Sequence, residues 1–334
     1  MEKDIRLRDI GEAGILARIF ERLPAEGAGI LVGSGDDAAA LVGSGDDAVV
    51  FASDAMVENV HFDLAFMTPA DVGWRLTCAN LSDLAAMGAT PRWATLALAL
   101  PSVDANWLAA FMRGFMRLAR AHDVDLIGGD TTRGPLNLCV QIMGEVPAGK
   151  ALRRDGARVG DDVWVSGTLG DAALAVAAGN KQMALNKQQR RTASMRLDRP
   201  MPRLALGAAL RGVAHSAIDV SDGLLADLTH ICERSRVAAV IAFDALPRSA
   251  LLRKLSSHAM AQRALLAGGD DYELCFTAAV SKRAAVRRAG ARSRTTVTRI
   301  GSVVRAPAGA VGVAVVDASG LPMRIVHRGF DHFG

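Results

Sequence analysis

Residues 33–62 read GSGDDAAALVGSGDDAVVFASDAMVENVHF, and this stretch guides the interpretation of the whole chain. Its two apolar runs, Ala38–Val42 and Ala48–Ala52, predict two strands. The glycines between the runs favour a hairpin turn, because glycine accepts positive φ angles. Acidic groups at the ends of such strands are typical ligands of Mg²⁺, which often keeps substrate phosphates in its coordination shell. The stretch contains Asp36, Asp37, Asp46, Asp47, Asp54 and Glu58. It therefore predicts a phosphate-handling enzyme with scattered carboxylate ligands.

The composition bounds the class of protein. A chain of 334 residues allows about two domains, and a hydrophobic content of 50% can form a sizeable core. The net charge is only +4 and aromatic residues make up 4%, so we expect no nucleic-acid partner. The four widely spaced cysteines favour reduced thiols and a cytoplasmic location. The charged first residues and the lack of a long apolar run predict neither a signal peptide nor a membrane association.

Local patterns predict the order of elements. Apolar spacing predicts a helix over residues 11–23. Thr68 and Pro69 are typical of a helix start, and Asp104 is typical of an N-cap. We expect strands at Trp93–Leu100, Val124–Ile127 and Leu138–Val146. A boundary at residues 147–149 divides the chain into domains 1–148 and 149–334. Strands and helices do not alternate strictly afterwards, which predicts an α+β fold.

Several acidic sites share one order: an apolar strand, small residues, then aspartate. Val124–Asp130 and Ile218–Asp222 show it most clearly. A single loop of this kind is more often an ordinary turn or helix cap. Asp83 differs, because it lies within an otherwise apolar helix. Burying its carboxylate costs several kcal/mol unless it is paired or binds a metal; a solvent-facing helix turn is the alternative.

Three other residues need an interpretation, and for each of them a structural one is available. His61 follows a strand-like run, where a lone histidine is more often structural than catalytic. Arg154 could hold a phosphate or belong to a surface turn. Tyr272 lies in a Gly- and Asp-rich segment and could be part of the core. The glycine-rich segments match neither a Walker A loop nor the motifs of protein kinases.

The motifs are more specific as an ordered set than singly. They are GSGDDAAA, SDAMVENVHF, NLSDLAAMGATP, LIGGDTTRG, GDDVWVSGTLGD, RPMPRL, AIDVSDGLLADL, GGDDYELCFT and GFDHF. Over nearly the whole chain, this set resembles the thiamine-monophosphate kinase family of the aminoimidazole-ribonucleotide-synthetase-like superfamily. The resemblance implies a two-domain α+β fold. Its N-terminal domain would bind ATP and Mg²⁺ and pair its mixed sheet across a homodimer, and its C-terminal α/β domain would complete the active-site cleft.

The resemblance also implies a reaction and a set of site residues. The γ-phosphoryl group of ATP would pass directly, in line, to thiamine monophosphate and give thiamine diphosphate, assisted by several Mg²⁺ ions. The implied metal ligands are Asp37, Ser53, Asp54, Asp83, Asp130, Asp219 and Asp222. The implied ATP contacts are Gly129, Asp130, Arg154 and Ser221, and the implied substrate contacts are His61, Asp270 and Phe330. No side-chain base is implied, because the second pKa of a phosphate acceptor is about 6.

The two GSGDD copies compete for the metal role. The spacing from Asp37 to Asp54 resembles that of the family, so the first copy is assigned to the metals, and Asp46 and Asp47 are expected to face solvent. Ala52, Ser53, Asp270 and Phe330 depart from the residues usual in the family. Two alternatives stay open: another ATP-dependent enzyme of the superfamily with a different acceptor, or a non-catalytic nucleotide- or metal-binding scaffold.

Overall fold

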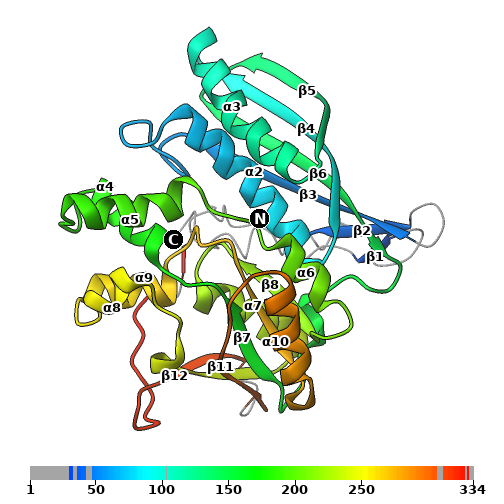
Figure 1. The fold of residues 1–334 in the computed structure, drawn as a ribbon, viewed down its shortest axis with the longest axis vertical. Helices are drawn as coiled ribbons and strands as arrows, with labels where there is room; N and C mark the ends of the chain where they lie inside the picture. The colour runs from blue at the N-terminus through cyan, green and yellow to red at the C-terminus, as the bar shows by residue number, and fades with distance from the viewer. Residues whose placement is uncertain are drawn as a thin grey trace, which may run out of the picture.

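The computed structural model describes residues 30–32, 36–42, 47–102, 104–306, 311–327 and 329–330. These residues form two six-stranded mixed sheets with helices packed against them (Figure 1). This arrangement confirms the predicted α+β class. The helix expected at residues 11–23, the hairpin turn at residues 43–46 and the end of the last motif lie outside the described residues.

The first sheet has the strand order β1-β2-β3-β6-β4-β5. Its strands are β1 (Ile30–Val32), β2 (Ala39–Val42), β3 (Asp47–Val57), β4 (Thr90–Leu100), β5 (Asp125–Arg133) and β6 (Asn137–Pro147). All neighbours are antiparallel except β4 and β5, which are parallel. The predicted hairpin is confirmed, because β2 and β3 pair from Ala39 opposite Phe51 to Val42 opposite Ala48.

Helices α2 (Pro69–Ala86) and α3 (Ala105–Ala121) lie against one face of this sheet (Figure 1). Both predicted N-caps are confirmed: Thr68 Oγ1 accepts the N–H of Asp71 at 3.2 Å, and Asp104 Oδ1 accepts that of Asn106 at 2.9 Å. The two helices pack very closely, since a Cβ atom at Gly114 would lie 1.8 Å from the carbonyl oxygen of Ala70. On the other face of the sheet, Phe51 and Trp93 remain 37% and 36% exposed.

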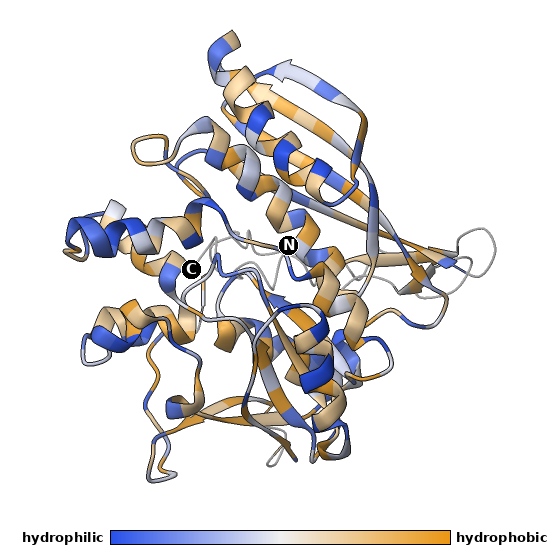
Figure 2. Cartoon of the chain, viewed as in Figure 1, coloured by the Kyte–Doolittle hydropathy of each residue, from blue (hydrophilic) through white to orange (hydrophobic). Residues whose placement is uncertain are grey.

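The second sheet has the order β12-β9-β11-β7-β10-β8, with only β12 and β9 parallel. Its strands are β7 (Asp162–Ser166), β8 (Ser216–Val220), β9 (Ala238–Ala242), β10 (Glu273–Ala278), β11 (Val297–Val304) and β12 (Gly312–Val316). Its helices are α4 (Asp171–Gly179), α5 (Lys187–Asp198), α6 (Leu204–Leu210), α7 (Leu224–Ser235), α8 (Ala250–Lys254), α9 (Ala259–Ala267) and α10 (Arg283–Arg292), with short 3₁₀ turns η2 (Arg154–Gly156), η3 (Phe243–Ala245) and η4 (Val280–Lys282). Apolar residues concentrate in the strands and the inner helix faces, and the outer faces of α5 and α10 are hydrophilic (Figure 2).

One predicted boundary is wrong. The strand expected to end at Ile127 continues as β5 to Arg133, so Asp130 lies within a strand and not on a loop after it. The extension depends on pairing with β4, where Gly129 is opposite Leu96. Gly129 has φ +152°, and a Cβ atom there would lie 1.9 Å from the Leu96 carbonyl oxygen. The glycine therefore permits the close approach of β5 to β4.

Helix α2 connects the two halves of the molecule. Its residues are almost all buried. Ser82 Oγ donates a hydrogen bond to Asp219 Oδ2 on β8 at 2.7 Å, and Trp74 Nε1 donates to the carbonyl oxygen of Pro200 at 2.7 Å. Functional side chains on α2 are therefore held against the second sheet. In the part of the chain that the structure describes, no helix is both long and apolar enough to cross a bilayer.

Candidate active site

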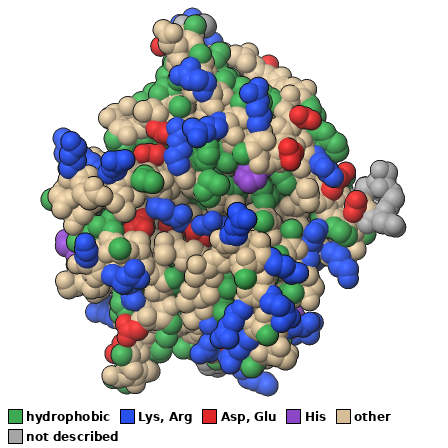
Figure 3. Space-filling view, in the orientation of Figure 1, with side chains coloured by type: hydrophobic (Ala, Val, Ile, Leu, Met, Phe, Trp, Pro, Cys, Tyr) green, Lys and Arg blue, Asp and Glu red, His purple; other side chains and the backbone are tan. Residues whose placement is uncertain are grey.

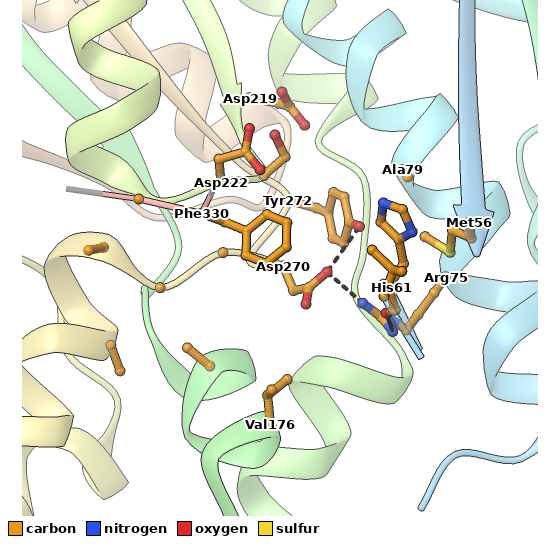
Figure 4. A pocket seen from close by; sticks show the side chains of 18 of the residues that line it. Met56, His61, Arg75, Ala79, Val176, Asp219, Asp222, Asp270, Tyr272 and Phe330 are labelled. Atoms are coloured by element: carbon orange, nitrogen blue, oxygen red, sulfur yellow. Dashed lines mark hydrogen bonds and ion pairs between the residues drawn. The ribbon is translucent and has the colours of Figure 1, made fainter. Parts of the chain in front are cut away.

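A pocket of about 450 Å³ lies between α2, the end of β3 and the segments that surround β8 and α9 (Figure 4). Acidic residues from α2 and β8, among them Asp83 and Asp219, line one end. Val176 on α4 lies at the other end, with Phe330 between (Figure 4), and further apolar residues of α4 and α9 also line the pocket. From outside, acidic side chains are visible across the middle of this face, beside Lys and Arg side chains (Figure 3). The pocket thus has an acidic end and an apolar end.

Three carboxylates converge at the acidic end. Asp37, Asp83 and Asp219 each offer an oxygen atom, and these atoms lie within 4.8 Å of one another. Asp37 precedes β2, Asp83 is on α2 and Asp219 is on β8, so three distant segments build the cluster. Asp219 is held in place by the hydrogen bond from Ser82. Oxygen ligands of this kind, from separate loops and elements, fit a hard divalent cation.

Burial, and then the charges of neighbouring carboxylates, raise the pKa of three carboxyl groups at the acidic end, those of Asp54, Asp83 and Asp219. Burial, followed by the charges of Asp222 and Asp37, raises the pKa of Asp54 to about 6. Burial and the charges of Asp54 and Asp219 raise the pKa of Asp83 well above its usual value. Burial and Asp37 do the same to the pKa of Asp219, against the hydrogen bond from Ser82. Full ionisation of these carboxyl groups is therefore unfavourable unless a cation binds, and in its absence a proton is retained.

Arg154 lies beside this cluster and contacts Asp37, one of the candidate metal ligands. Its Nη2 is 2.7 Å from Asp37 Oδ1, and its main-chain N–H donates to Asp36 Oδ1 at 2.8 Å. Burial lowers the pKa of Arg154, but the charge of Asp37 outweighs this and raises the pKa above its usual value. Arg154 therefore stays cationic and neutralises one carboxylate. Asp36 is not fully compensated, because burial and Asp37 raise its pKa to about 6.

The structure brings most of the predicted site residues together. The pocket is lined by Asp54, His61, Asp83, Asp219, Ser221, Asp222, Asp270 and Phe330. Asp37 joins them through the carboxylate cluster, with Arg154 bound to it. Phe330 is 51% exposed, and its N–H donates to the Asp222 carbonyl oxygen at 3.1 Å. His61 Nδ1 accepts the N–H of Val57 at 3.0 Å.

Ser53, Gly129 and Asp130 do not line this pocket. Strand alternation turns Ser53 to the opposite face of β3 from Asp54, and its Oγ lies 3.6 Å from Cys139 Sγ. Gly129 and Asp130 are exposed on β5, the edge strand, three positions from β3 in the strand order. At about 4.8 Å per strand this amounts to about 14 Å. Asp46 lies outside the described residues, and Asp47 is exposed at the start of β3, as expected.

Arg75 was not predicted as a pocket residue, and Tyr272 was expected only as part of the core, yet both line the pocket. Arg75 is only 2% exposed, and its Nη2 lies 2.5 Å from Asp270 Oδ1. The hydroxyl of Tyr272 donates to the same oxygen at 3.2 Å. A signal for Arg75 was present: it is a charged residue in the same apolar helix as Asp83, two turns earlier.

Comparison with known proteins identifies the family. The N-terminal domain of AIR synthase related protein matches residues 35–146, and the C-terminal domain of that family matches residues 158–314. The thiamine-monophosphate kinase of Salmonella typhimurium is 40% identical over 324 residues, which cover 97% of this chain and 98% of that protein.

Solved structures agree with this match. The thiamine-monophosphate kinase from Stenotrophomonas maltophilia K279a is 48% identical, with a TM-score of 0.76 over 90% of this chain and 93% of that one. The structure of AaThiL complexed with AMPPCP and TMP is 29% identical, with a TM-score of 0.84 over 98% of this chain and 99% of that one. These matches confirm the predicted fold, and the chain belongs to the thiamine-monophosphate kinase family.

Proposed function

We propose that the pocket transfers the γ-phosphoryl group of ATP to thiamine monophosphate and releases thiamine diphosphate. The curated relatives are named for this kinase activity, and AaThiL forms a complex with AMPPCP and TMP. Within this chain, the observation that carries the proposal is the division of one pocket into an acidic and an apolar end. The acidic end suits metal-bound phosphates, and the apolar end suits a heteroaromatic ring.

Helix α2 sets the distance between the two ends. Arg75, Ala79 and Asp83 all line the pocket, and residues four apart lie on the same helix face. At 1.5 Å per residue, Asp83 lies about 12 Å along the helix axis from Arg75. A substrate with a phosphate at one end and a ring system at the other can therefore reach from Asp83 to the region of the pocket beside Arg75.

We propose that several Mg²⁺ ions bind at the acidic end. Asp37, Asp54, Asp83, Asp219 and Asp222 are the ligands that one copy of the chain supplies there. The ions would offset the repulsion between the two anionic reactants. The acceptor phosphate is mostly ionised at neutral pH, since its second pKa is about 6, so the chain needs no general base. The described lining residues include no lysine, and a direct in-line transfer is the simplest scheme.

We propose that Ser53, Gly129 and Asp130 act in a homodimer. Asp130 is too far from Asp54 to share an ion within one copy, at about 14 Å across the sheet. The face of the sheet that carries the exposed Phe51 and Trp93 offers an apolar surface for a second copy. Asp130 of that copy would then supply the metal and nucleotide contact. The division into domains at residues 148 and 149 is part of the same proposal, with the first domain carrying the dimer surface.

Subunit mixing tests this arrangement. The Asp54→Ala and Asp130→Ala proteins are each expected to be inactive. If one site takes Asp54 from one copy and Asp130 from the other, random mixing of the two proteins restores about a quarter of the wild-type activity, because half of the dimers hold one intact site. The control mixture of Asp54→Ala with Asp83→Ala stays inactive. Recovery in neither mixture would place both aspartates in the same copy and overturn the shared site.

The activity itself is tested by incubation with ATP, Mg²⁺ and thiamine monophosphate, followed by chromatography for thiamine diphosphate. The expected product appears with the wild-type protein and not with Asp83→Asn. ATP consumption without thiamine diphosphate would indicate a different acceptor. Nucleotide binding with no ATP consumption under any of these conditions would indicate a non-catalytic scaffold.

A further inference from the structure

A partly buried ion pair, Arg75 with Asp270, lies in the pocket between the acidic residues Asp219 and Asp222 and the apolar end at Val176 (Figure 4). The Arg75 guanidinium contacts Asp270 through Nη2, while its Nη1 donates to the carbonyl oxygen of His61 at 3.0 Å and approaches Met67 Sδ at 3.2 Å. Burial lowers the pKa of Arg75, but the charge of Asp270 outweighs it and raises that pKa above its usual value. Arg75 therefore stays cationic beside the Asp270 carboxylate, and three contacts fix the position of its guanidinium.

The two oxygens of Asp270 are used differently. Arg75 Nη2 and the Tyr272 hydroxyl both bind Oδ1, at 2.5 and 3.2 Å (Figure 4). Neither of these bonds uses Oδ2. The Asp270 side chain is 28% exposed, and the residue lines the pocket. Oδ2 is thus the oxygen that remains available to a bound molecule.

The backbone around Asp270 is held in an uncommon conformation. Asp270 and Tyr272 have φ angles of +67° and +50°, in the left-handed region that non-glycine residues rarely adopt. The N–H of each is fixed, with Asp270 donating to the Ser221 carbonyl oxygen at 2.8 Å and Tyr272 donating to that of Val220 at 2.9 Å. Such strain persists where the surroundings over-determine the conformation, and it is common at ligand sites. Backbone and side chain together therefore orient the Asp270 carboxylate.

We infer that Arg75 is a positioning residue for recognition of the substrate ring. Together with Tyr272 it holds Asp270 by one oxygen, and it leaves the other oxygen to accept a hydrogen bond from a ring amine or to face a cationic ring. This inference rests on the proposed function, because thiamine monophosphate supplies both an amine and a cationic ring. Arg75 lies about 12 Å along α2 from Asp83, so it would not contact phosphates bound at the acidic end.

The test compares the KM values for the two substrates in Arg75→Lys and Tyr272→Phe. A lysine keeps the charge but loses the planar set of donors. A hydrogen bond to a charged group contributes about 1.5–3 kcal/mol, so Arg75→Lys is expected to raise the KM for thiamine monophosphate about 10- to 100-fold. The KM for ATP should change less than about twofold. Tyr272→Phe removes one weaker bond and is expected to raise the KM for thiamine monophosphate about threefold to tenfold.

Arg203→Lys is the matched control. Arg203 also contacts a buried carboxylate at 2.5 Å, that of Glu273, but neither residue lines the pocket. We expect this variant to lower the melting temperature without a selective change in either KM. If Arg75→Lys and Arg203→Lys behave alike, the Arg75 pair is structural and the inference is wrong.

A double-mutant cycle measures the coupling between Arg75 and Asp270, and a purely structural role of Arg75 predicts no such coupling in the KM. In an Asp270→Asn background, Arg75→Lys should have little further effect on the KM for thiamine monophosphate. A full additional effect would mean that Arg75 acts independently of Asp270. If Arg75→Lys does not fold, a cycle of Tyr272→Phe with Asp270→Asn replaces it. An effect of Tyr272→Phe that persists in the Asp270→Asn background would then overturn the idea that the contacts to Asp270 position this carboxylate. Turnover by the wild-type protein tests the proposed function separately, so failure of one idea is distinguishable from failure of the other.

Discussion

Glu273 and the carboxylate cluster of the pocket show how the chain uses carboxylates for two different purposes. Glu273 is fully buried and binds Arg203 through both oxygens, Arg196 at 2.8 Å and Ser166 Oγ at 2.5 Å. In the pocket, Asp83 and Asp219 instead face other carboxylates, and among the described residues Arg154 lies nearby as the partner of Asp37. The chain supplies the compensating charge for Glu273 and leaves the pocket cluster for an external cation. The first arrangement stabilises the fold, and the second prepares a binding site.

The largest expected effect comes from the pocket cluster. Asp83→Asn or Asp54→Asn removes a metal ligand and is expected to lower kcat about 1,000-fold or more. The same variants relieve repulsion, so the metal-free protein should melt at a higher temperature than the wild type. Steady-state kinetics and thermal melting with and without Mg²⁺ measure both effects. Near-normal turnover in either variant would show that the metal assignment is wrong.

Glu273→Gln is expected to have the opposite pattern. It leaves Arg196 and Arg203 without their carboxylate in a buried position, which should lower the free energy of unfolding by about 3 kcal/mol. Urea denaturation measures this change. The folded fraction should keep its KM values, because Glu273 does not line the pocket. A loss of stability below about 1 kcal/mol would mean that Glu273 and the pocket cluster do not differ as described.

The pH dependence of stability in the metal-free protein is expected to distinguish the pocket carboxylates from Glu273. The usual pKa of Asp54 is 3.8, and in the folded protein it is raised to about 6, so the folded state binds more protons between these values. Stability from this group is therefore greatest below pH 4 and falls as the pH rises through about 6, by about 3 kcal/mol in total.

Mg²⁺ competes with these protons, so its stabilising effect should be larger at pH 7.5 than at pH 5. Denaturation curves at both pH values, with and without Mg²⁺, measure the difference. Asp54→Asn should remove part of the pH dependence, and Glu273→Gln should leave it in place. Equal stabilisation by Mg²⁺ at both pH values would contradict a cluster of carboxylates with raised pKa values.

Local signals explain what the sequence could predict. The caps at Thr68 and Asp104 and the strand that became β4 depend on neighbouring residues, and all three are confirmed. The continuation of β5 through Asp130 depends on pairing with β4, which no local pattern reveals. The Arg75–Asp270 pair joins residues 195 positions apart, so the sequence showed only an unexplained charge in an apolar helix. The meeting of Asp37, Asp83 and Asp219 was expected from the family resemblance and not from spacing alone.

The smallest expected effect distinguishes the two copies of LVGSGDDA, at residues 31–38 and 41–48. The period of ten residues is even, so a slip by one repeat would keep every side chain on the same face of its strand. In the structure the Asp37 side chain is 1% exposed and paired with Arg154, whereas Asp47 is exposed beside the end of β6. Asp47→Asn should therefore change turnover less than about twofold and stability by less than about 0.5 kcal/mol.

The matched variant Asp37→Asn should lower turnover at least about 100-fold. Combining Asp46→Asn with Asp47→Asn should still leave the enzyme active, and an inactive double variant with an active Asp37→Asn protein would assign the metals to the second copy.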